Sequence, residues 1–342
     1  MTNREIAEKL GISPAALSLI INHKPGVSDD TRKRVLQELQ HMGAEYLIKK
    51  SPSVPSNNLC FIIYKRHGEI LDSHPFFLLL MENIETLARS YGYNILLSTI
   101  DKRKEIDSQI QNINDMNCSG AIIFATEMMN DDMEAFQNLQ IPFVAIDNDF
   151  TKLSCNTISI NNQMGTSQAI DHLIQAGLRR IGYLRATIRI SSFIERQQGY
   201  ENTLHSYGLE FQPGDILDVH YSEEGSYRDL HDYLAKNDNA PLADAFVCDD
   251  DTIAVGAIRA FNEAGYRVPE DISIIGFNDR PNCEVTIPPL TTVNVSKHAL
   301  AVEAVDELMR MIRHPEQNSP DARSRKIRIG TKLIQRKSVR II

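Results

Sequence analysis

The first 42 residues alternate apolar and polar positions with the spacing of three short helices. Apolar residues recur three or four positions apart in 2–10, in 13–22 and in 28–42, so each segment presents one apolar stripe. Two of these helices are joined by a turn of about three residues, and the second one exposes small and hydroxyl side chains, which predicts a helix-turn-helix. A three-helix interaction module that contacts no nucleic acid is the alternative.

Capping residues mark where these helices begin and end. Thr2 and Glu5 form a capping box, while Ser13 and Pro14 supply an N-cap followed by proline at the first helical position. Gly11 stands where a helix end favours a left-handed residue. The segment therefore has local signals for its turns as well as for its helices.

From residue 58 onward, short apolar runs alternate with amphipathic segments. The runs expected to be strands are 59–64, 94–99, 120–125, 142–147, 180–186, 216–220, 245–250 and 272–277. The segments expected to be helices are 76–93, 103–116, a stretch through Phe136, 164–176, 193–207, 226–236 and 252–264. This alternation predicts two doubly wound lobes with parallel sheets, and a small-molecule site in the cleft at the strand C-termini.

The chain is too long for one hydrophobic core, so several domains are expected. Pro52, Pro55 and neighbouring serines interrupt the pattern as a linker does. The expected division is a helix-turn-helix domain at 1–46, a linker at 47–57 and a two-lobed effector-binding and dimerisation domain at 58–342. Its lobes are expected at about 58–161 and 162–289, with the chain crossing between them again after 290.

Composition limits the class of protein. No apolar run approaches the roughly 18 residues that a membrane span needs, and the N-terminus reads as a capped helix instead of a signal peptide. Five scattered cysteines without a CxxC pair suit reduced thiols. We expect a cytoplasmic protein with no membrane contact, no cofactor and no bound metal.

Charge is unevenly distributed along the chain. The net charge is −9, but residues 1–50 hold eight Lys or Arg against six Asp or Glu, which gives +2 and leaves −11 for the rest. A mildly basic head on an acidic body suits a protein that grips DNA through one end.

The sequence resembles that of the lactose/galactose repressor family over nearly its whole length. In the head the matching runs are Glu5-Ile6-Ala7, Leu10-Gly11-Ile12-Ser13, Leu17-Ser18, Ile20-Ile21-Asn22 and Val27-Ser28-x-x-Thr31-Arg32-x-x-Val35. In the body they include Gly165-x-x-x-Ala169, Arg179-Arg180-Ile181, Arg196-x-x-Gly199-Tyr200, Asp250-Asp251-x-x-Ala254, Val268-Pro269-x-Asp271, Gly276-Phe277-Asn278-Asp279 and Pro289-Leu290-Thr291-Thr292-Val293. The resemblance implies an all-α head on an α/β core like that of periplasmic sugar-binding proteins.

Two departures from the family pattern stand out. After Tyr46 the sequence lacks the Pro-Asn and Ala-x-x-Leu motifs that form a hinge helix in the family, so the hinge is expected to be degenerate. The family more often has Asn where this chain has Asp250 and Asp where it has Asn278.

Candidate DNA-binding residues lie in the head. We expect Ala15, Ser18 and Leu19 to read thymine methyl groups and DNA shape, because no arginine stands where a guanine contact would need one. The full expected DNA-binding set is Ser13, Pro14, Ala15, Ser18, Leu19, Asn22, Lys24, Thr31, Arg32 and Tyr46.

Candidate effector residues follow predicted strands or open predicted helices. Carboxylates, an amide and a guanidinium that converge there suit the adjacent hydroxyls of a sugar, and an aromatic face suits its ring. The expected set is His74, Phe76, Phe77, Asp147, Ser192, Arg196, Asp250 and Asn278. Asp251 is interpreted as a possible cap for the following helix.

The expected function is a ligand-responsive repressor of carbohydrate-utilisation genes that binds an inverted-repeat operator in double-stranded DNA as a homodimer. A sugar-like effector is preferred, with a nucleobase or a protein co-regulator as alternatives. Asp249, Asp250 and Asp251 raise the alternative of a metal-dependent enzyme, but neighbouring strand residues face opposite ways and ligate one ion poorly. The chain is therefore not expected to be an enzyme.

Overall fold

The computed structural model describes residues 3–21, 26–44, 47, 56–71, 75–237, 241–318 and 323–340. Thr2, Asn22, Lys24, Tyr46 and His74, for which roles were expected, lie outside these residues, as does most of the linker. The chain separates into two compact units, residues 1–56 and 57–342. None of the helices in the described parts is long and apolar enough to span a membrane.

The N-terminal unit is a three-helix head formed by α1 (Asn3–Lys9), α2 (Pro14–Ile21) and α3 (Asp29–His41). The predicted stripes meet in one small core: Ile6, Ala7, Leu17, Ile20, Ile21, Val35, Leu39 and Ala44 are all buried. Gly11 has a φ of +63°, which confirms the left-handed turn expected between α1 and α2.

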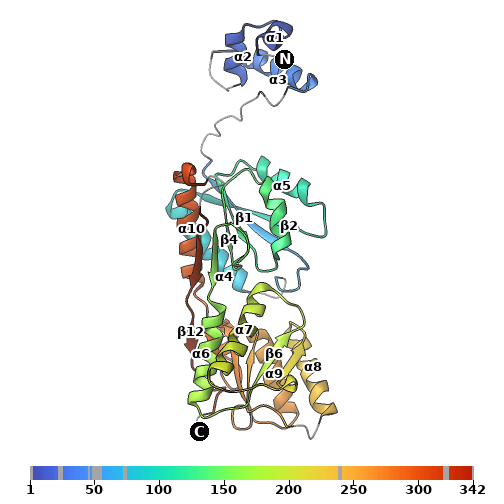
Figure 1. The fold of residues 1–342 in the computed structure, drawn as a ribbon, viewed down its shortest axis with the longest axis vertical. Helices are drawn as coiled ribbons and strands as arrows, with labels where there is room; N and C mark the ends of the chain where they lie inside the picture. Colours follow the sequence, from blue (N-terminus) through green and yellow to red (C-terminus); the bar gives the residue numbers. More distant parts are fainter. Residues whose placement is uncertain are drawn as a thin grey trace. The chain divides into compact units, whose positions relative to one another are not determined.

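The second unit begins with a lobe built on a six-stranded parallel sheet, drawn with the other lobe in Figure 1. In order across the sheet the strands are β11 (Lys326–Ile329), β5 (Thr157–Ile160), β4 (Phe143–Ile146), β3 (Gly120–Phe124), β1 (Asn58–Lys65) and β2 (Asn94–Asp101). The helices of this lobe 1 are α4 (Pro75–Ser90), α5 (Ile106–Asp115), the 3₁₀ helix Asn130–Asn138 and α10 (Lys297–Arg313).

Strand β1 shows why a continuous apolar run predicted a sheet covered on both faces. Leu59, Phe61 and Ile63 pack with α4 and α10 in one cluster, whereas Cys60 and Ile62 pack with α5 and the 3₁₀ helix in another. Successive strand residues point to opposite faces, so both faces need apolar side chains.

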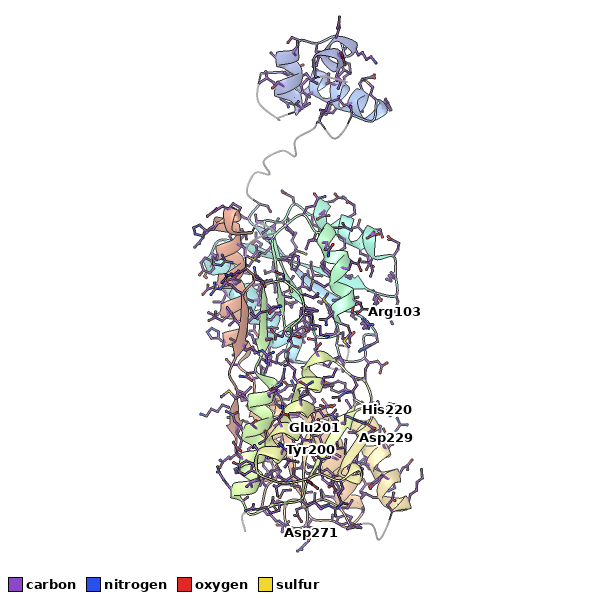
Figure 2. The ribbon with its side chains drawn as sticks, in the orientation of Figure 1. Arg103, Tyr200, Glu201, His220, Asp229 and Asp271 are labelled. Carbon is purple, nitrogen blue, oxygen red and sulfur yellow. The ribbon has the colours of Figure 1, made fainter. Side chains whose placement is uncertain are left out.

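Lobe 2 repeats the plan with one antiparallel exception. Its strands in sheet order are β12 (Lys332–Ile334), β10 (Thr291–Asn294), β9 (Ser273–Asn278), β8 (Ala245–Cys248), β6 (Ile181–Ala186) and β7 (Ile216–Val219). Its helices are α6 (Asn162–Gln175), α7 (Ser191–Ser206), α8 (Glu223–Lys236) and α9 (Asp251–Glu263), with short 3₁₀ turns at Pro213–Asp215 and Pro281–Glu284. A further 3₁₀ turn, Pro315–Asn318, follows α10 of lobe 1. Tyr200 fixes α7 to the sheet, since its hydroxyl donates to the Ile181 carbonyl at 2.7 Å (Figure 2).

The chain passes between the lobes three times. It leaves lobe 1 after β5 to begin α6, returns after β10 to begin α10, and leaves again after β11 to form β12. Gln168 ties the last crossing to α6, because its side chain donates to the Thr331 carbonyl at 3.1 Å and accepts from the Thr331 hydroxyl at 3.0 Å.

The predicted fold class is confirmed: an all-α head precedes an α/β core of two doubly wound lobes. Three details differ from the prediction. The segment through Phe136 is a 3₁₀ helix, tied at its start by the Asp132 carboxylate, which accepts from the Met129 amide at 2.8 Å. Strand β12 is antiparallel to β10, because the last crossing enters lobe 2 directly without a helix. Strand β5 and the elements after residue 290 had not been assigned from sequence.

Candidate functional site

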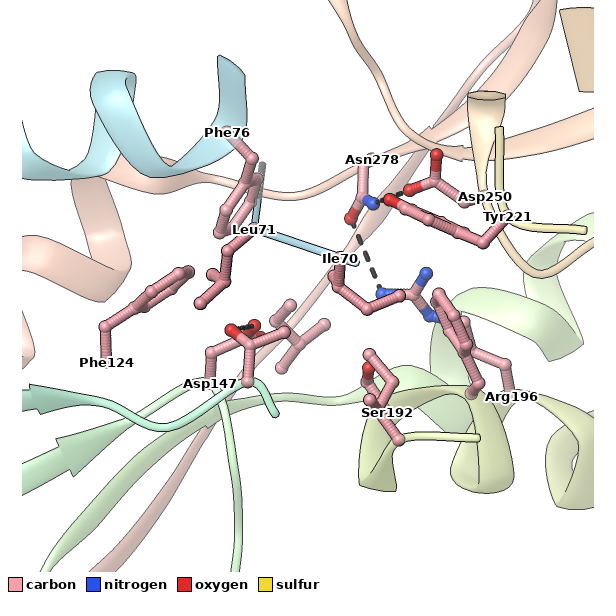
Figure 3. A pocket seen from close by; sticks show the side chains of 14 residues that line it. Ile70, Leu71, Phe76, Phe124, Asp147, Ser192, Arg196, Tyr221, Asp250 and Asn278 are labelled. Atoms are coloured by element: carbon pink, nitrogen blue, oxygen red, sulfur yellow. Dashed lines mark hydrogen bonds between the residues drawn. The ribbon is translucent and has the colours of Figure 1, made fainter. Parts of the chain in front are cut away.

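A cavity with a free volume of about 20 Å³ lies between the two lobes, at the C-terminal ends of their strands (Figure 3). Lobe 1 contributes the loop after β1, the start of α4 and the ends of β3, β4 and β5. Lobe 2 contributes α7 and the ends of β7, β8 and β9. The lining residues are Ile70, Leu71, Phe76, Phe124, Thr126, Asp147, Ile160, Ile190, Ser192, Phe193, Arg196, Tyr221, Asp250 and Asn278. This space suffices for about one water molecule, so a small-molecule effector fits only if the residues that line the cavity move apart.

Arg196 is the principal cation of this cavity. It belongs to α7 and is only 3% exposed. Its Nε donates to the Asn162 side-chain oxygen at 2.9 Å and its Nη1 to the Asp249 carbonyl at 2.5 Å. The guanidinium stacks on the Phe277 ring, 3.7 Å from the ring centroid. These contacts hold the planar fork rigid, so it is pre-organised to donate to a ligand.

Asp147 faces this cation from lobe 1. The Thr126 hydroxyl donates to its Oδ2 at 2.5 Å. Burial raises the pKa of Asp147 to about 6, against the lowering influences of the Thr126 hydrogen bond and the Arg196 charge. Asp147 also has a φ of +67°, and Asn278 across the cavity has a φ of +104°. Such left-handed backbone in non-glycine residues costs about 1–3 kcal/mol and collects at functional sites.

Asp250 and Asn278 contact each other directly. The Asn278 amide donates to Asp250 Oδ2 at 2.5 Å, and Arg280 pairs with the other oxygen at 3.0 Å. Arg280 in turn donates to the Tyr221 hydroxyl at 2.8 Å. In this chain Asn278 is therefore the donor and Asp250 the acceptor of one hydrogen bond between the two side chains.

Asp250, and not Asp251, caps α9, because Asp250 Oδ1 accepts from the Thr252 amide at 2.8 Å. The Asp251 carboxylate instead accepts from the Arg280 amide and the Thr292 hydroxyl, at 2.9 Å and 2.5 Å. Burial and the neighbouring Asp250 carboxylate raise the pKa of Asp251.

Asp249 faces a third set of donors. It accepts from the Tyr183 hydroxyl at 2.6 Å, the Ala186 amide at 2.8 Å and Arg189 at 2.6 Å. Three consecutive carboxylates thus have separate partners, and no cluster suited to a metal ion occurs within the part of the chain that the structure describes.

Aromatic and aliphatic side chains complete the walls. Phe76 on α4 lies beneath Lys297, whose Nζ is 5.5 Å from the ring centroid. Phe77, also expected at the site, lies outside the cavity lining: its ring packs against Phe61 and Phe124, with centroids 5.9 Å and 5.6 Å apart. Adjacent helical residues point about 100° apart, so only one of the two phenylalanines faces the cleft.

The structure brings six of the eight expected effector residues to one cavity: Phe76, Asp147, Ser192, Arg196, Asp250 and Asn278. His74 lies outside the described residues. Thr126 and Tyr221 were not predicted. Each lies two residues after a strand, β3 and β7 respectively, so the expectation that site residues follow strand C-termini also applies to them. Ile70 and Leu71 carried no sequence signal, because apolar loop residues have many roles.

On the head, the exposed surface of α2 is formed by expected DNA-contact residues. Ser13, Pro14, Ala15 and Ser18 are exposed, and Leu19 is half-buried. Ser13 also caps α2, since its hydroxyl accepts from the Ala16 amide at 3.1 Å.

Thr31 and Arg32 have structural contacts in the head. The Thr31 and Ser28 hydroxyls are 2.8 Å apart at the start of α3. Arg32 Nη1 donates to the Ile20 carbonyl at 3.4 Å and lies 3.5 Å from the Leu19 carbonyl, so it binds the last turn of α2. The DNA contact expected of Arg32 has to coexist with this role.

Comparisons with known proteins agree with this architecture. Residues 170–339 match the family model of the periplasmic binding protein-like domain. The chain is 28% identical to the ribose operon repressor of Haemophilus influenzae over 93% of both chains. It is also 28% identical to the HTH-type transcriptional repressor PurR of the same species, over 100% of this chain and 99% of that one.

Among solved structures, the lac repressor dimer bound to operator and the anti-inducer ONPF aligns with a TM-score of 0.70 and 21% identity, over 99% of each chain. The fold of the head and of the two lobes is thus shared with this structure along the whole chain. The chain is thus similar over nearly its whole length to transcriptional repressors, among them the ribose operon repressor and PurR.

Proposed function

We propose that the protein is a repressor that binds an operator through its head and is controlled by a small molecule in the inter-lobe cavity. The observation that carries this proposal is the cavity itself. A rigid guanidinium, a buried carboxylate and an amide converge from both lobes of a chain that also carries a helix-turn-helix. Full-length similarity to repressors supports the same conclusion.

The effector is proposed to be a sugar or sugar derivative, with a nucleobase as the second candidate. Arg196, Asp147 and Asn278 offer the mixture of donors and acceptors that adjacent hydroxyls need. Phe76 and Tyr221 offer aromatic surface against which a sugar ring or a base packs. The name of the ribose operon repressor supports a sugar as the effector, whereas the name of PurR does not state an effector class.

The proposal is tested by thermal shift against a panel of sugars, sugar phosphates, polyols and purines, followed by operator binding with and without the hit. A ligand at 100 times its Kd stabilises the protein by about 2.7 kcal/mol. A true effector also changes operator affinity, by a coupling energy of about 1–3 kcal/mol. A hit that stabilises the protein but leaves operator affinity unchanged would contradict its role as effector.

Operator reading is proposed to depend on Leu19. Leu19→Ala is expected to weaken preference for the matched A·T pair by about 1 kcal/mol, because the side chain loses its apolar contact with a thymine methyl. Competition binding with single-base operator variants measures this. Leu36→Ala is the matched control, since Leu36 is a half-buried leucine of α3 that packs on the same head core. Unchanged base preference in Leu19→Ala would refute the assignment.

Dimerisation is proposed to use the α4 and β2 surface of lobe 1. Leu78 on α4 is 58% exposed and Leu97 on β2 is 52% exposed, and β2 is an edge strand. Leu78→Glu is expected to raise the dimer Kd at least tenfold, which analytical ultracentrifugation measures. Tyr207→Lys, at the similarly exposed Tyr207 that follows α7, should leave the dimer Kd unchanged. A dimer unaffected by Leu78→Glu would place the interface elsewhere.

A further inference from the structure

The loop between β1 and α4 is wrapped around one buried carboxylate. Glu127 follows β3 and is 1% exposed. Its Oε2 accepts from the amides of Arg66, His67 and Gly68 at 2.9, 3.1 and 2.8 Å, and its Oε1 from those of Ile70 and Leu71 at 3.1 and 3.4 Å. Five backbone donors of one short loop thus converge on a single side chain from another part of lobe 1.

This arrangement is an anion-binding nest whose anion is supplied by the protein. Gly68 has a φ of +88°, and a left-handed residue within a short loop turns successive amides toward one point. The base of the loop is fastened as well. Arg66 pairs with the buried Asp132 at 2.5 Å, and Arg103, labelled in Figure 2, lies 3.5 Å from the His67 carbonyl.

The loop carries Ile70 across the cleft. Ile70 is 1% exposed and belongs to a cluster of buried side chains with Ile190, Phe193 and Tyr221. Every other buried member of that cluster lies between residues 184 and 290, which is lobe 2. Figure 3 shows Ile70 reaching toward Arg196 and Tyr221, in the middle of the cavity. Leu71, one position later, packs instead against the cluster that contains the lobe 1 residues Phe76 and Phe124.

We propose that loop 66–71 is a latch that closes the cavity before any effector binds. Glu127 is the positioning residue that holds the loop, and Ile70 is the side chain that packs against lobe 2. The proposal rests on the proposed function only in that the latched cavity is the one assigned to the effector. Closing by Ile70 excludes water from that cavity, and an effector enters after the loop has left Glu127 and lobe 2.

The latch predicts how accessible the cavity is in the ligand-free protein. The chain contains no tryptophan, so a Tyr221→Trp reporter gives fluorescence from the cavity wall alone. Acrylamide quenching of the full-length protein then measures access without any effector. Ile70→Ala and Glu127→Ala, each in the reporter background, are expected to raise the quenching constant at least threefold.

The two variants distinguish a latch from a simple gap. Glu127→Ala keeps the isoleucine side chain, so increased quenching there shows that the loop has moved. Acetate replaces the carboxylate and methylene that this substitution removes, and it should lower the quenching of Glu127→Ala but not that of Ile70→Ala. Leu87→Ala is the matched control, because it removes a leucine side chain of α4 that packs against the other cluster and lies outside the cavity lining.

Equal quenching of Ile70→Ala, Glu127→Ala and the reporter protein would overturn the latch, and so would an equal increase in Leu87→Ala. If circular dichroism shows that Glu127→Ala does not fold, Glu127→Gln tests the same nest, since its amide nitrogen is a donor placed where one carboxylate oxygen accepts from backbone amides. Failure of the ligand panel leaves these outcomes unaffected, because they concern the ligand-free protein.

Discussion

Asp147→Asn is expected to stabilise the ligand-free protein at pH 7 by roughly 2–3 kcal/mol. The pKa of this carboxyl rises from 3.8 to about 6 on folding, chiefly through burial, and each unit corresponds to about 1.36 kcal/mol. The folded protein therefore binds the proton more tightly between these pH values. Stability falls as pH rises from about 4 to about 6 and stays lower above that, because the ionised group is then buried. The neutral amide of asparagine avoids this cost.

Denaturant unfolding of wild type and variant at pH 4 and pH 7 measures the difference. The variant should be more stable at pH 7 and nearly equal to wild type at pH 4. Asp232→Asn, at an exposed carboxylate of α8, is the control and should change neither value by more than about 0.5 kcal/mol. A variant less stable than wild type at pH 7 would show that the ionised carboxylate is fully satisfied. The stabilised variant should bind the effector more weakly, since the carboxylate is retained for binding.

Arg196→Ala is expected to weaken effector binding at least 100-fold. The substitution removes a buried cation whose fork is already oriented by Asn162 and the Asp249 carbonyl, and hydrogen bonds to charged groups contribute about 1.5–3 kcal/mol each. Arg196→Lys should recover little, because an ammonium cannot make two parallel bonds or stack on Phe277. Titration calorimetry with the hit from the ligand panel measures the loss.

A general loss of stability has to be separated from this effect. Arg180→Ala breaks a part-buried pair with Asp215, 2.7 Å long, at the other end of β6. It should lower the melting temperature and leave effector affinity unchanged. If Arg196→Ala bound the hit with the wild-type Kd, the hit would lie outside the cavity.

Much of the fold was predictable because both lobes follow a local rule. Continuous apolar runs such as 59–64 separated by amphipathic helices determine a covered parallel sheet. Strand β5 (Thr157–Ile160) has only two aliphatic side chains, so its short sequence gave little signal. The partners of β11 and β12 lie more than 30 residues away in the chain, so their sheet membership depends on tertiary contacts.

The candidate site was predictable where it follows from strand ends. Asp147, Asp250 and Asn278 end strands or follow them directly, so topology alone brings them together. Ile70 escaped because its partners belong to the other lobe. Glu127 escaped because its partners are backbone amides, which have no sequence signature.

The three crossings between the lobes also determine which motion the molecule transmits. Three chain connections between two lobes restrict their relative motion more than one connection would, which favours hinge closure. Small molecules of different size that bind between the lobes are then expected to change the same inter-lobe angle by different amounts. The effector can therefore change during evolution through substitutions in the cavity lining, while the hinge motion that it controls stays the same.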